Sequence, residues 1–421
     1  MVDVVVAGAV RTPVGKFGGA LKDVSAQELG AIAIKGLLKK LGLNPVHREN
    51  SYISNLKTGR IELEERYHDF SGTEIQIDEV IMGNVLQAAL GQNPARQSSI
   101  YAGIPKETPA LTVNKVCGSG LKAIAIAASS IAYEENEVVI AGGMESMSNA
   151  PYAIPNARWG IRMFNSSVVD LMVHDGLWEI FYGYHMGMTA ENLAELYGIT
   201  REEQDELAYE SHMRAVKAID NGYFSEEIVP VMVKQKKEEI TVDTDEHPRR
   251  DTTLEKLSRL PPVFKKDGTV TAGNASGIND GASALLLMSS EKAEEIGLKP
   301  LARVVSYGFG ALDPAYMGLG SIPAIKKTLS KAEFTLDDMD LIELNEAFAA
   351  QAIAVMGELE VDSSRVNVNG SGISLGHPIG ATGARITTTL LHEMRRRKAD
   401  FGLSALCIGG GMGFAMIFER V

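Results

Sequence analysis

Four landmarks occur twice in this chain, in the same order. Each half shows an apolar run with a Gly-rich loop, a second apolar run, a turn leading into a small-residue helix, and a strand that ends in glycines. These landmarks begin at residues 3, 77, 117 and 140 in the first half and at residues 302, 339, 376 and 406 in the second. Such repetition indicates two copies of one β/α unit packed together.

Between these landmarks, apolar runs typical of strands alternate with amphipathic runs typical of helices. Strands are predicted at 3–8, 79–82, 137–141, 284–288, 302–306, 341–344 and 403–408. Helices are predicted at 25–41, 120–133, 201–221, 322–331 and 382–397. Continuous apolar strands between amphipathic helices predict an α/β protein with a largely buried mixed sheet and helical layers.

The same landmarks divide the chain into three parts. Residues 1–147 and 278–299 form an N-terminal half, and residues 300–421 form a C-terminal half. Residues 148–277, which are rich in methionine and aromatics and then in charge, fit a loop domain over a site formed by the halves. A polar stretch at about 47–73 is interpreted as a surface insertion, either a solvated excursion without function or an added subunit contact.

Composition excludes several classes of protein. The net charge is 41 − 54 = −13, so nucleic acid is not expected as a partner, although a small anionic ligand remains compatible. No uncharged apolar run reaches the roughly 18 residues that a membrane span needs, and the first residues do not resemble a signal peptide. We therefore expect a cytoplasmic protein that does not bind membranes.

The chain has two cysteines, Cys117 and Cys407, too few for a disulfide framework or a Cys-rich zinc site, and no metal is predicted. Cys117 lies in a segment, 114–125, that changes from strand to helix. The positive end of a helix favours thiolate over thiol, so the pattern predicts a nucleophile of lowered pKa. Flanking glycines permit a sharp turn and the approach of a substrate.

Three further motifs carry polar groups that suit the same chemistry. His377 lies in a Gly- and Pro-rich turn, 370–383, where it can accept a proton or donate to an oxyanion. Cys407 ends a strand and is followed by glycines whose N–H groups can face an anion. A P-loop is excluded because no Gly-Lys-Ser/Thr follows, and a dinucleotide site is disfavoured so near the chain end. Asn345 follows an apolar strand and opens a helix, where it can hold a water or a carbonyl oxygen.

Together these motifs resemble the thiolase family over nearly the whole chain, except for the insertion. Further matching segments are 141–148, 184–187, 271–277 and 345–348. The sequences of residues 175–178 and 184–189 are most similar to those of short-chain thiolases, the acetoacetyl-CoA type. Two departures lie at 370–373, with Gly-Ser-Gly-Ile in place of Gly-Gly-Ala-Ile, and at Ser321, where proline is usual.

The resemblance implies a thiolase fold, with mixed five-stranded sheets in an α-β-α-β-α layering, and a role for each motif. Cys117 is acylated by the first acyl-CoA. His377 activates it and lines an oxyanion hole with a water held by Asn345. Cys407 removes a proton from the second acetyl-CoA, and the N–H groups of Cys117 and Gly409 form a second oxyanion hole.

The resemblance also implies coenzyme A as substrate and product, with no tightly bound cofactor, and a homotetramer (a dimer of dimers) or a homodimer. The CoA tunnel is expected to be lined by Leu177, His185, Met186, Arg249, Phe264, Ala272, Ser276, Met317, Ala347 and Phe348. Arg249 suits the nucleotide end of CoA.

The implied activity is reversible Claisen condensation of two acetyl-CoA to acetoacetyl-CoA and CoA through an acyl-cysteine, an acetyl-CoA C-acetyltransferase. The alternative is a longer-chain 3-ketoacyl-CoA thiolase of fatty-acid β-oxidation. A non-catalytic acyl-CoA or lipid carrier is disfavoured by the intact set of Cys117, Asn345, His377 and Cys407. If the two cysteines converge, reversible oxidation to a disulfide also remains open.

Overall fold

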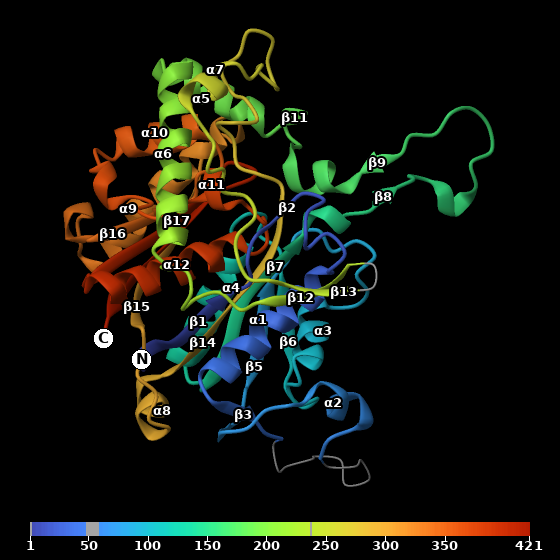
Figure 1. The fold of residues 1–421 in the computed structure, drawn as a ribbon, viewed down its shortest axis with the longest axis vertical. Coiled ribbons are helices and arrows are strands. Elements are labelled where there is room, and N and C mark those ends of the chain that lie inside the picture. The colour runs from blue at the N-terminus through green and yellow to red at the C-terminus, as the bar shows by residue number, and fades with distance from the viewer. Residues whose placement is uncertain (1, 48–58, 236–237) are drawn as a thin grey trace.

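The computed structural model describes residues 2–47, 59–235 and 238–421, and one mixed sheet of ten strands runs through them (Figure 1). The strand order is β16-β17-β18-β15-β1-β14-β7-β5-β6, with β2 paired to β14. The strands are β1 Val4–Arg11, β2 Gly15–Lys16, β5 Glu79–Gly83, β6 Ala110–Val113, β7 Val138–Ser146, β14 Asn279–Ser289, β15 Ala302–Ala311, β16 Leu341–Leu344, β17 Phe401–Ile408 and β18 Met412–Arg420.

The two halves meet where β1 pairs antiparallel with β15, through Val5 with Arg303 and Val6 with Ala302. Apart from β2, the first half contributes five strands to this sheet and the second half contributes four. Beyond β16 there is a single bridge between Ile342 and Val366. The five strands of the first half match the expected five-stranded sheets, whereas the second half has four strands and this bridge. A 3-10 turn at Ser363–Arg365 and the positive φ of Asn367 limit the extended segment to that one residue.

Two buried helices, α4 (Ser119–Ala132) and α12 (Thr382–Arg397), pack against each other between the strands of the two halves. Small residues make this approach possible: a Cβ on Gly120 would lie 2.8 Å from the backbone N of Ala384. Helices α1 (Ala26–Lys40) and α3 (Pro94–Tyr101) cover the outer face of the first half, and α9 (Ser321–Ala332) and α10 (Ala349–Glu358) cover that of the second. The predicted α/β layering is confirmed.

Residues between β7 and β14 form smaller elements above the sheet and one projecting arm (Figure 1). Helices α5 (Gly187–Tyr197), α6 (Arg201–Asp220) and α7 (Leu254–Ser258) pack near α10 and α11 (Gly372–Leu375). The arm runs from β8 (Tyr152–Ala153) to β9 (Val169–Asp170) and ends far from the rest of the chain. Two further hairpins pair β10 (Trp178–Glu179) with β11 (Tyr184–His185) and β12 (Val231–Gln235) with β13 (Glu238–Val242).

The predicted insertion is partly described, since residues 48–58 lie outside the described residues. Its described part comprises α2 (Glu62–Tyr67) and leads to β4 (Thr73–Ile75), which pairs with β3 (Leu43–Pro45). Asp69 forms ion pairs of 2.7 Å with Lys35 and Lys39 of α1. Buried Glu64 accepts the backbone N–H groups of Ile61 and Lys106. These ion pairs and hydrogen bonds therefore hold the described part of the insertion against the first half.

Helix α8 (Ser290–Glu295) follows β14 and connects the halves. None of the helices in the described part of the chain combines the length and apolar character that a membrane crossing requires.

Candidate active site

Cys117 lies in a strained turn just before α4. The preceding residue, Val116, has φ 46°, a left-handed conformation that is costly for a β-branched side chain. The Ser119 hydroxyl holds the turn, since it donates to the Val116 carbonyl (2.6 Å) and accepts from the Lys115 N–H (2.8 Å). A Cβ on Gly118 would lie 2.3 Å from Cδ1 of Ile408. Only glycine lets the turn meet the opposite half at this distance.

The electrostatics of Cys117 differ from the prediction. Burial raises the pKa of its thiol to about 11, and the backbone N–H groups of Gly409 and of Cys117 itself only partly oppose the rise. The predicted lowering of this pKa was wrong because packing from the other half of the chain, invisible to a local pattern, removes water from the sulfur. Cys117 nevertheless keeps partial exposure, as a group that meets a substrate requires.

Cys407 comes from the second half, at the end of β17, and is 1% exposed. Gly410 and Gly411 have φ of 82° and 77° and turn the chain tightly into β18. This turn directs the Gly409 N–H at the Cys117 sulfur. Burial raises the pKa of the Cys407 thiol, and the charge that Cys117 can carry raises it further. The structure thus brings Cys117, Cys407 and Gly409 together.

His377 is held rigidly in its turn. Its backbone N–H donates to Oδ1 of Asn279 (2.9 Å), and its Nδ1 lies 2.7 Å from Oγ1 of Thr382. The side chain is 5% exposed. Burial, with a contribution from the charge of Arg385, lowers the pKa of His377 to about 3. The imidazole is therefore neutral at rest.

The amide of Asn345 is buried, and neither its Oδ1 nor its Nδ2 has a hydrogen-bond partner among the described residues. Its backbone N–H donates to the Ala405 carbonyl, which extends β16 toward β17. A Cβ on Gly372 would lie 2.7 Å from Oδ1 of Asn345, so glycine makes room for the amide. The helix that Asn345 was expected to open, α10, begins only at Ala349. An amide with both ends free can hold a water or a carbonyl oxygen.

Glu145 lies against the turn of His377, and the sequence assigned it no role. It is fully buried and accepts from the side chain of Asn84 (2.7 Å) and the backbone N–H groups of Val85, Leu86 and Gly380. Burial raises its pKa to about 7. Because Gly380 belongs to the turn that contains His377, its hydrogen bond to Glu145 connects that turn to the first half. A lone glutamate at the end of an apolar strand was the available signal.

Most residues expected to line the CoA tunnel lie beside the cysteines. Met186, Met317, Ala347 and Phe348 form one apolar cluster with Cys407. Phe264 meets Phe348 edge-on at 6.2 Å and stacks on His185 at 4.6 Å. The Ser276 N–H donates to the Ala347 carbonyl, and Leu177 packs in the cluster that Cys117 borders.

Arg249 and Ala272 lie together at a small cavity of about 120 Å³. Lys256, buried His212 and half-buried His247 also border it. Burial lowers the pKa of both histidines to about 4, and the Arg249 N–H donates to Nδ1 of His212. The cations here are thus Arg249 and Lys256.

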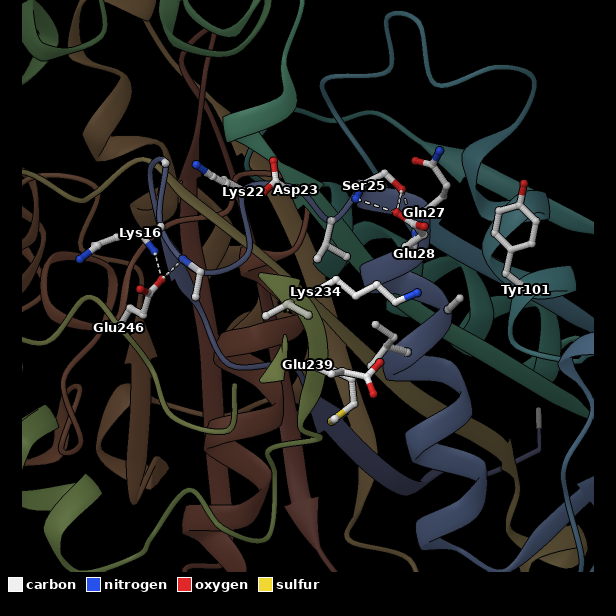
Figure 2. Close-up of a pocket in the computed structure, with 18 of the residues that line it drawn as sticks. Lys16, Lys22, Asp23, Ser25, Gln27, Glu28, Tyr101, Lys234, Glu239 and Glu246 are labelled. Atoms are coloured by element: carbon white, nitrogen blue, oxygen red, sulfur yellow. Dashed lines mark hydrogen bonds between the residues drawn. The ribbon is translucent and has the colours of Figure 1, made fainter. Parts of the chain in front are cut away.

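A groove of about 1190 Å³ lies elsewhere (Figure 2). It lies between α1, Tyr67 and Tyr101 on one side and the β12–β13 hairpin on the other. Glu246 accepts there from the backbone N–H of Lys16, both labelled in Figure 2, and from that of Ala20. The groove contains neither cysteine nor histidine, so it does not serve the chemistry described above.

One cluster of possible metal ligands occurs among the described residues, formed by His47, Glu64 and Glu107 near the insertion. The ammonium of Lys106 lies 2.7 Å from Glu107 and 3.7 Å from Glu64. Lysine therefore already supplies the positive charge that these carboxylates require.

Comparison with known proteins agrees with this geometry. Residues 4–65 and 71–291 match the thiolase N-terminal domain, and residues 298–420 match the thiolase C-terminal domain. The chain belongs to the thiolase family. The acetyl-CoA acetyltransferase of Syntrophomonas wolfei is 53% identical over 423 residues, covering 100% of this chain and 99% of the relative.

Two solved thiolases have nearly the same fold. The crystal structure of the Bacillus anthracis acetyl-CoA acetyltransferase aligns with a TM-score of 0.90 and 46% identity, covering 100% of this chain and 99% of the other. Human mitochondrial 3-ketoacyl-CoA thiolase in complex with CoA aligns with a TM-score of 0.88 and 44% identity, covering 100% and 98%. The family and fold inferred from the sequence are confirmed.

Proposed function

We propose that this thiolase is an acetyl-CoA C-acetyltransferase, which condenses two acetyl-CoA reversibly to acetoacetyl-CoA and CoA. The observation that carries the proposal is the convergence of Cys117, Cys407 and the Gly409 N–H from two halves of the chain. A nucleophile, a second thiol and an anion donor in one place suit acyl transfer followed by carbon–carbon bond formation. The Syntrophomonas wolfei relative carries the corresponding name.

In the first half-reaction, the Cys117 sulfur attacks the thioester carbonyl while its proton passes to Nε2 of His377. The CoA–acyl bond breaks, and the departing CoA thiolate takes the proton of Cys407. An acyl-Cys117, a Cys407 thiolate and a His377 imidazolium remain. The raised pKa of Cys117 explains why a base is needed, since little free thiolate exists at neutral pH.

In the second half-reaction, the Cys407 thiolate removes a proton from the α-carbon of another acetyl-CoA. The carbanion attacks the acyl carbonyl, and Cys117 leaves as a thiolate that recovers its proton from His377. Burial makes the Cys407 thiolate a stronger base, which suits a weak carbon acid. Cys117, His377 and Cys407 are then back in their starting protonation states. The proton that Cys407 gave to CoA has been replaced by the one from the α-carbon.

Both half-reactions build negative charge on a thioester oxygen. The N–H groups of Cys117 and Gly409 form one oxyanion hole, and His377 with a water held by Asn345 forms the other. The unpaired amide of Asn345 supports the second assignment, because a buried amide without partners has hydrogen bonds to offer. Preorganised donors of this kind contribute about 3–4 kcal/mol each.

CoA is bound beneath residues 148–277, with its pantetheine arm along the apolar cluster that Met186, Met317, Ala347 and Phe348 form with Cys407. Arg249 and Lys256 face the cavity that receives the nucleotide end. The stacked rings of His185 and Phe264 form an apolar wall beside the path of the substrate.

A longer-chain 3-ketoacyl-CoA thiolase is the second candidate, since the human relative with that name aligns over the whole chain. Thiolysis of acetoacetyl-CoA by CoA, compared with 3-ketohexanoyl-CoA and longer homologues, separates the two. Fast turnover of acetoacetyl-CoA alone supports the proposal. Turnover of the longer substrates supports the second candidate function. If folded protein turns over none of these substrates, both candidate functions are overturned.

We also propose a homotetramer built through the arm between β8 and β9, and action in the cytoplasm. The arm exposes Tyr152, Ile154, Trp159, Ile161, Met163, Phe164 and Val168. So many exposed apolar side chains on one arm are typical of an interface. A catalytic pair of free thiols favours a reducing compartment.

A further inference from the structure

Thr382 makes two contacts that bear on His377. It is the first residue of α12 and is fully buried. Its Oγ1 lies 2.7 Å from Nδ1 of His377 and 2.9 Å from the carbonyl oxygen of Pro378. In the part of the chain that the structure describes, the hydroxyl of Thr382 is the hydrogen-bond partner of the His377 ring.

The hydroxyl of a threonine carries one proton, so these two contacts determine each other. Helical threonines commonly donate to the carbonyl four residues earlier, and Thr382 stands in that relation to Pro378. If the proton points at Pro378, Oγ1 can only accept from the ring. Nδ1 of His377 then carries a proton, and Nε2 keeps its lone pair.

The opposite arrangement has a different chemical consequence. If the hydroxyl donated to Nδ1, the neutral ring would carry its proton on Nε2. That nitrogen could donate to an oxyanion, but it could not take the proton of Cys117. The orientation of one buried hydroxyl thus decides whether the ring begins the reaction as a base.

We propose that Thr382 is a positioning residue, which holds His377 in the Nδ1–H tautomer and so keeps Nε2 free to accept the proton of Cys117. This inference rests on the proposed function, in which His377 is that base. As Cys117 attacks the thioester, its proton moves to Nε2 and the ring becomes positively charged. Oγ1 of Thr382 continues to accept from Nδ1, and the proton later returns from Nε2 to the departing Cys117 thiolate.

The surroundings of the ring make this acceptor important. Burial and the charge of Arg385, on the same helix, disfavour the positive ring. Glu145 of β7 is the carboxylate that binds the His377 turn, through the Gly380 N–H. Cys117, in the turn before α4, and Cys407, at the end of β17, contribute further titratable groups. An acceptor in direct contact with Nδ1 stabilises the ring at the moment that it becomes charged.

The test compares Thr382→Val, which keeps the shape but removes the hydroxyl, with Thr382→Ser, which keeps the hydroxyl. Thr387→Val is a matched control. Thr387 is equally buried on the same helix and donates to the Gly383 carbonyl four residues earlier, but it meets Ser404 instead of the histidine. Each variant is assayed for single-turnover acylation by acetoacetyl-CoA, for KM, and for the pH profile of acylation.

We expect Thr382→Val to acylate about 100-fold more slowly, with KM unchanged and a displaced pH profile. Thr382→Ser and Thr387→Val should stay near the wild-type rate with the wild-type profile. The role of Thr382 would be overturned if Thr382→Val acylated at the wild-type rate, or if the Ser and Val variants lost equal acylation rate. In either case an active wild type would still uphold the proposed function. A wild type that does not turn over overturns both. If Thr382→Val does not fold, Thr382→Ala replaces it.

Discussion

The backbone N–H of Gly409 is directed at the sulfur of Cys117, although the two residues belong to opposite halves of the chain. The contact needs the strained turn at Val116 on one side and the two positive-φ glycines after Gly409 on the other. A catalytic sulfur and its anion donor are thus assembled only when the two β/α units pack together. Each half alone carries an incomplete site.

Substitution of Gly409 tests this contact. A Cβ there would lie 2.9 Å from Cε of Met186 and 3.2 Å from Cγ1 of Val116, so in Gly409→Ala these side chains or the turn that carries the N–H must shift. We expect kcat to fall about 100-fold, as for loss of one oxyanion donor, with little change in KM. Gly357→Ala is the control, because nothing lies within 4 Å of its Cβ. Equal kcat in both variants would contradict the assignment.

The reactivity of Cys117 should follow its raised pKa. Burial raises the pKa of Cys117 to about 11 and lowers that of His377 to about 3, so the resting pair is a neutral thiol and a neutral imidazole. Only the thiolate is alkylated. Inactivation of the Cys407→Ala variant by iodoacetamide should therefore accelerate continuously from about pH 6 to about pH 10. A plateau across neutral pH would instead reveal a preformed thiolate–imidazolium pair.

Arg249 should act on the nucleotide end of CoA. Because its side chain is exposed, we expect Arg249→Ala to raise KM for CoA about fivefold, near 1 kcal/mol. Its neighbour Arg250 pairs with Asp220 at the surface, so Arg250→Ala is a matched control. The acetoacetyl thioester of N-acetylcysteamine, which lacks the nucleotide, should show no difference. An equal effect on that substrate would show that Arg249 supports the fold instead.

The projecting arm should control assembly. Trp159 and Phe164 are 78% and 89% exposed, and burial of such aromatic side chains drives association. Trp159→Asp with Phe164→Asp should reduce the particle mass in sedimentation by half or more, with an unchanged circular dichroism spectrum. Arg158→Asp, on the same arm, changes charge without removing an aromatic side chain. An unchanged mass in the double variant would remove the arm from the interface.

Much of the fold was predictable because local patterns determine it. The helix predicted at 382–397 forms as Thr382–Arg397, and that at 201–221 as Arg201–Asp220, the latter capped by Thr200 and Glu203. Cys117, His377 and Cys407 were recognisable because glycines or prolines mark the turns that hold them, and Asn345 because it follows an apolar strand. Strand β18, which follows the glycines after Cys407, was not among the predicted strands.

The rest depends on contacts between distant parts of the chain. The single sheet through β1 and β15 is a pairing of two strands whose own patterns do not specify a partner. The four donors around Glu145 and the hydroxyl beside His377 follow from tertiary packing. The direction of the Cys117 pKa shift was missed for the same reason, because desolvation by the opposite half outweighs the local helix.

The division of labour between the two cysteines is tested most directly by trapping the acyl-enzyme. Cys407→Ala and Cys117→Ala proteins are each mixed with acetyl-CoA, and the intact proteins and their peptides are weighed by mass spectrometry. The account predicts one acetyl group on Cys117 in the Cys407→Ala protein and no acetoacetyl-CoA from either variant. An acetyl group on Cys407, or condensation by the Cys117→Ala protein, would contradict it.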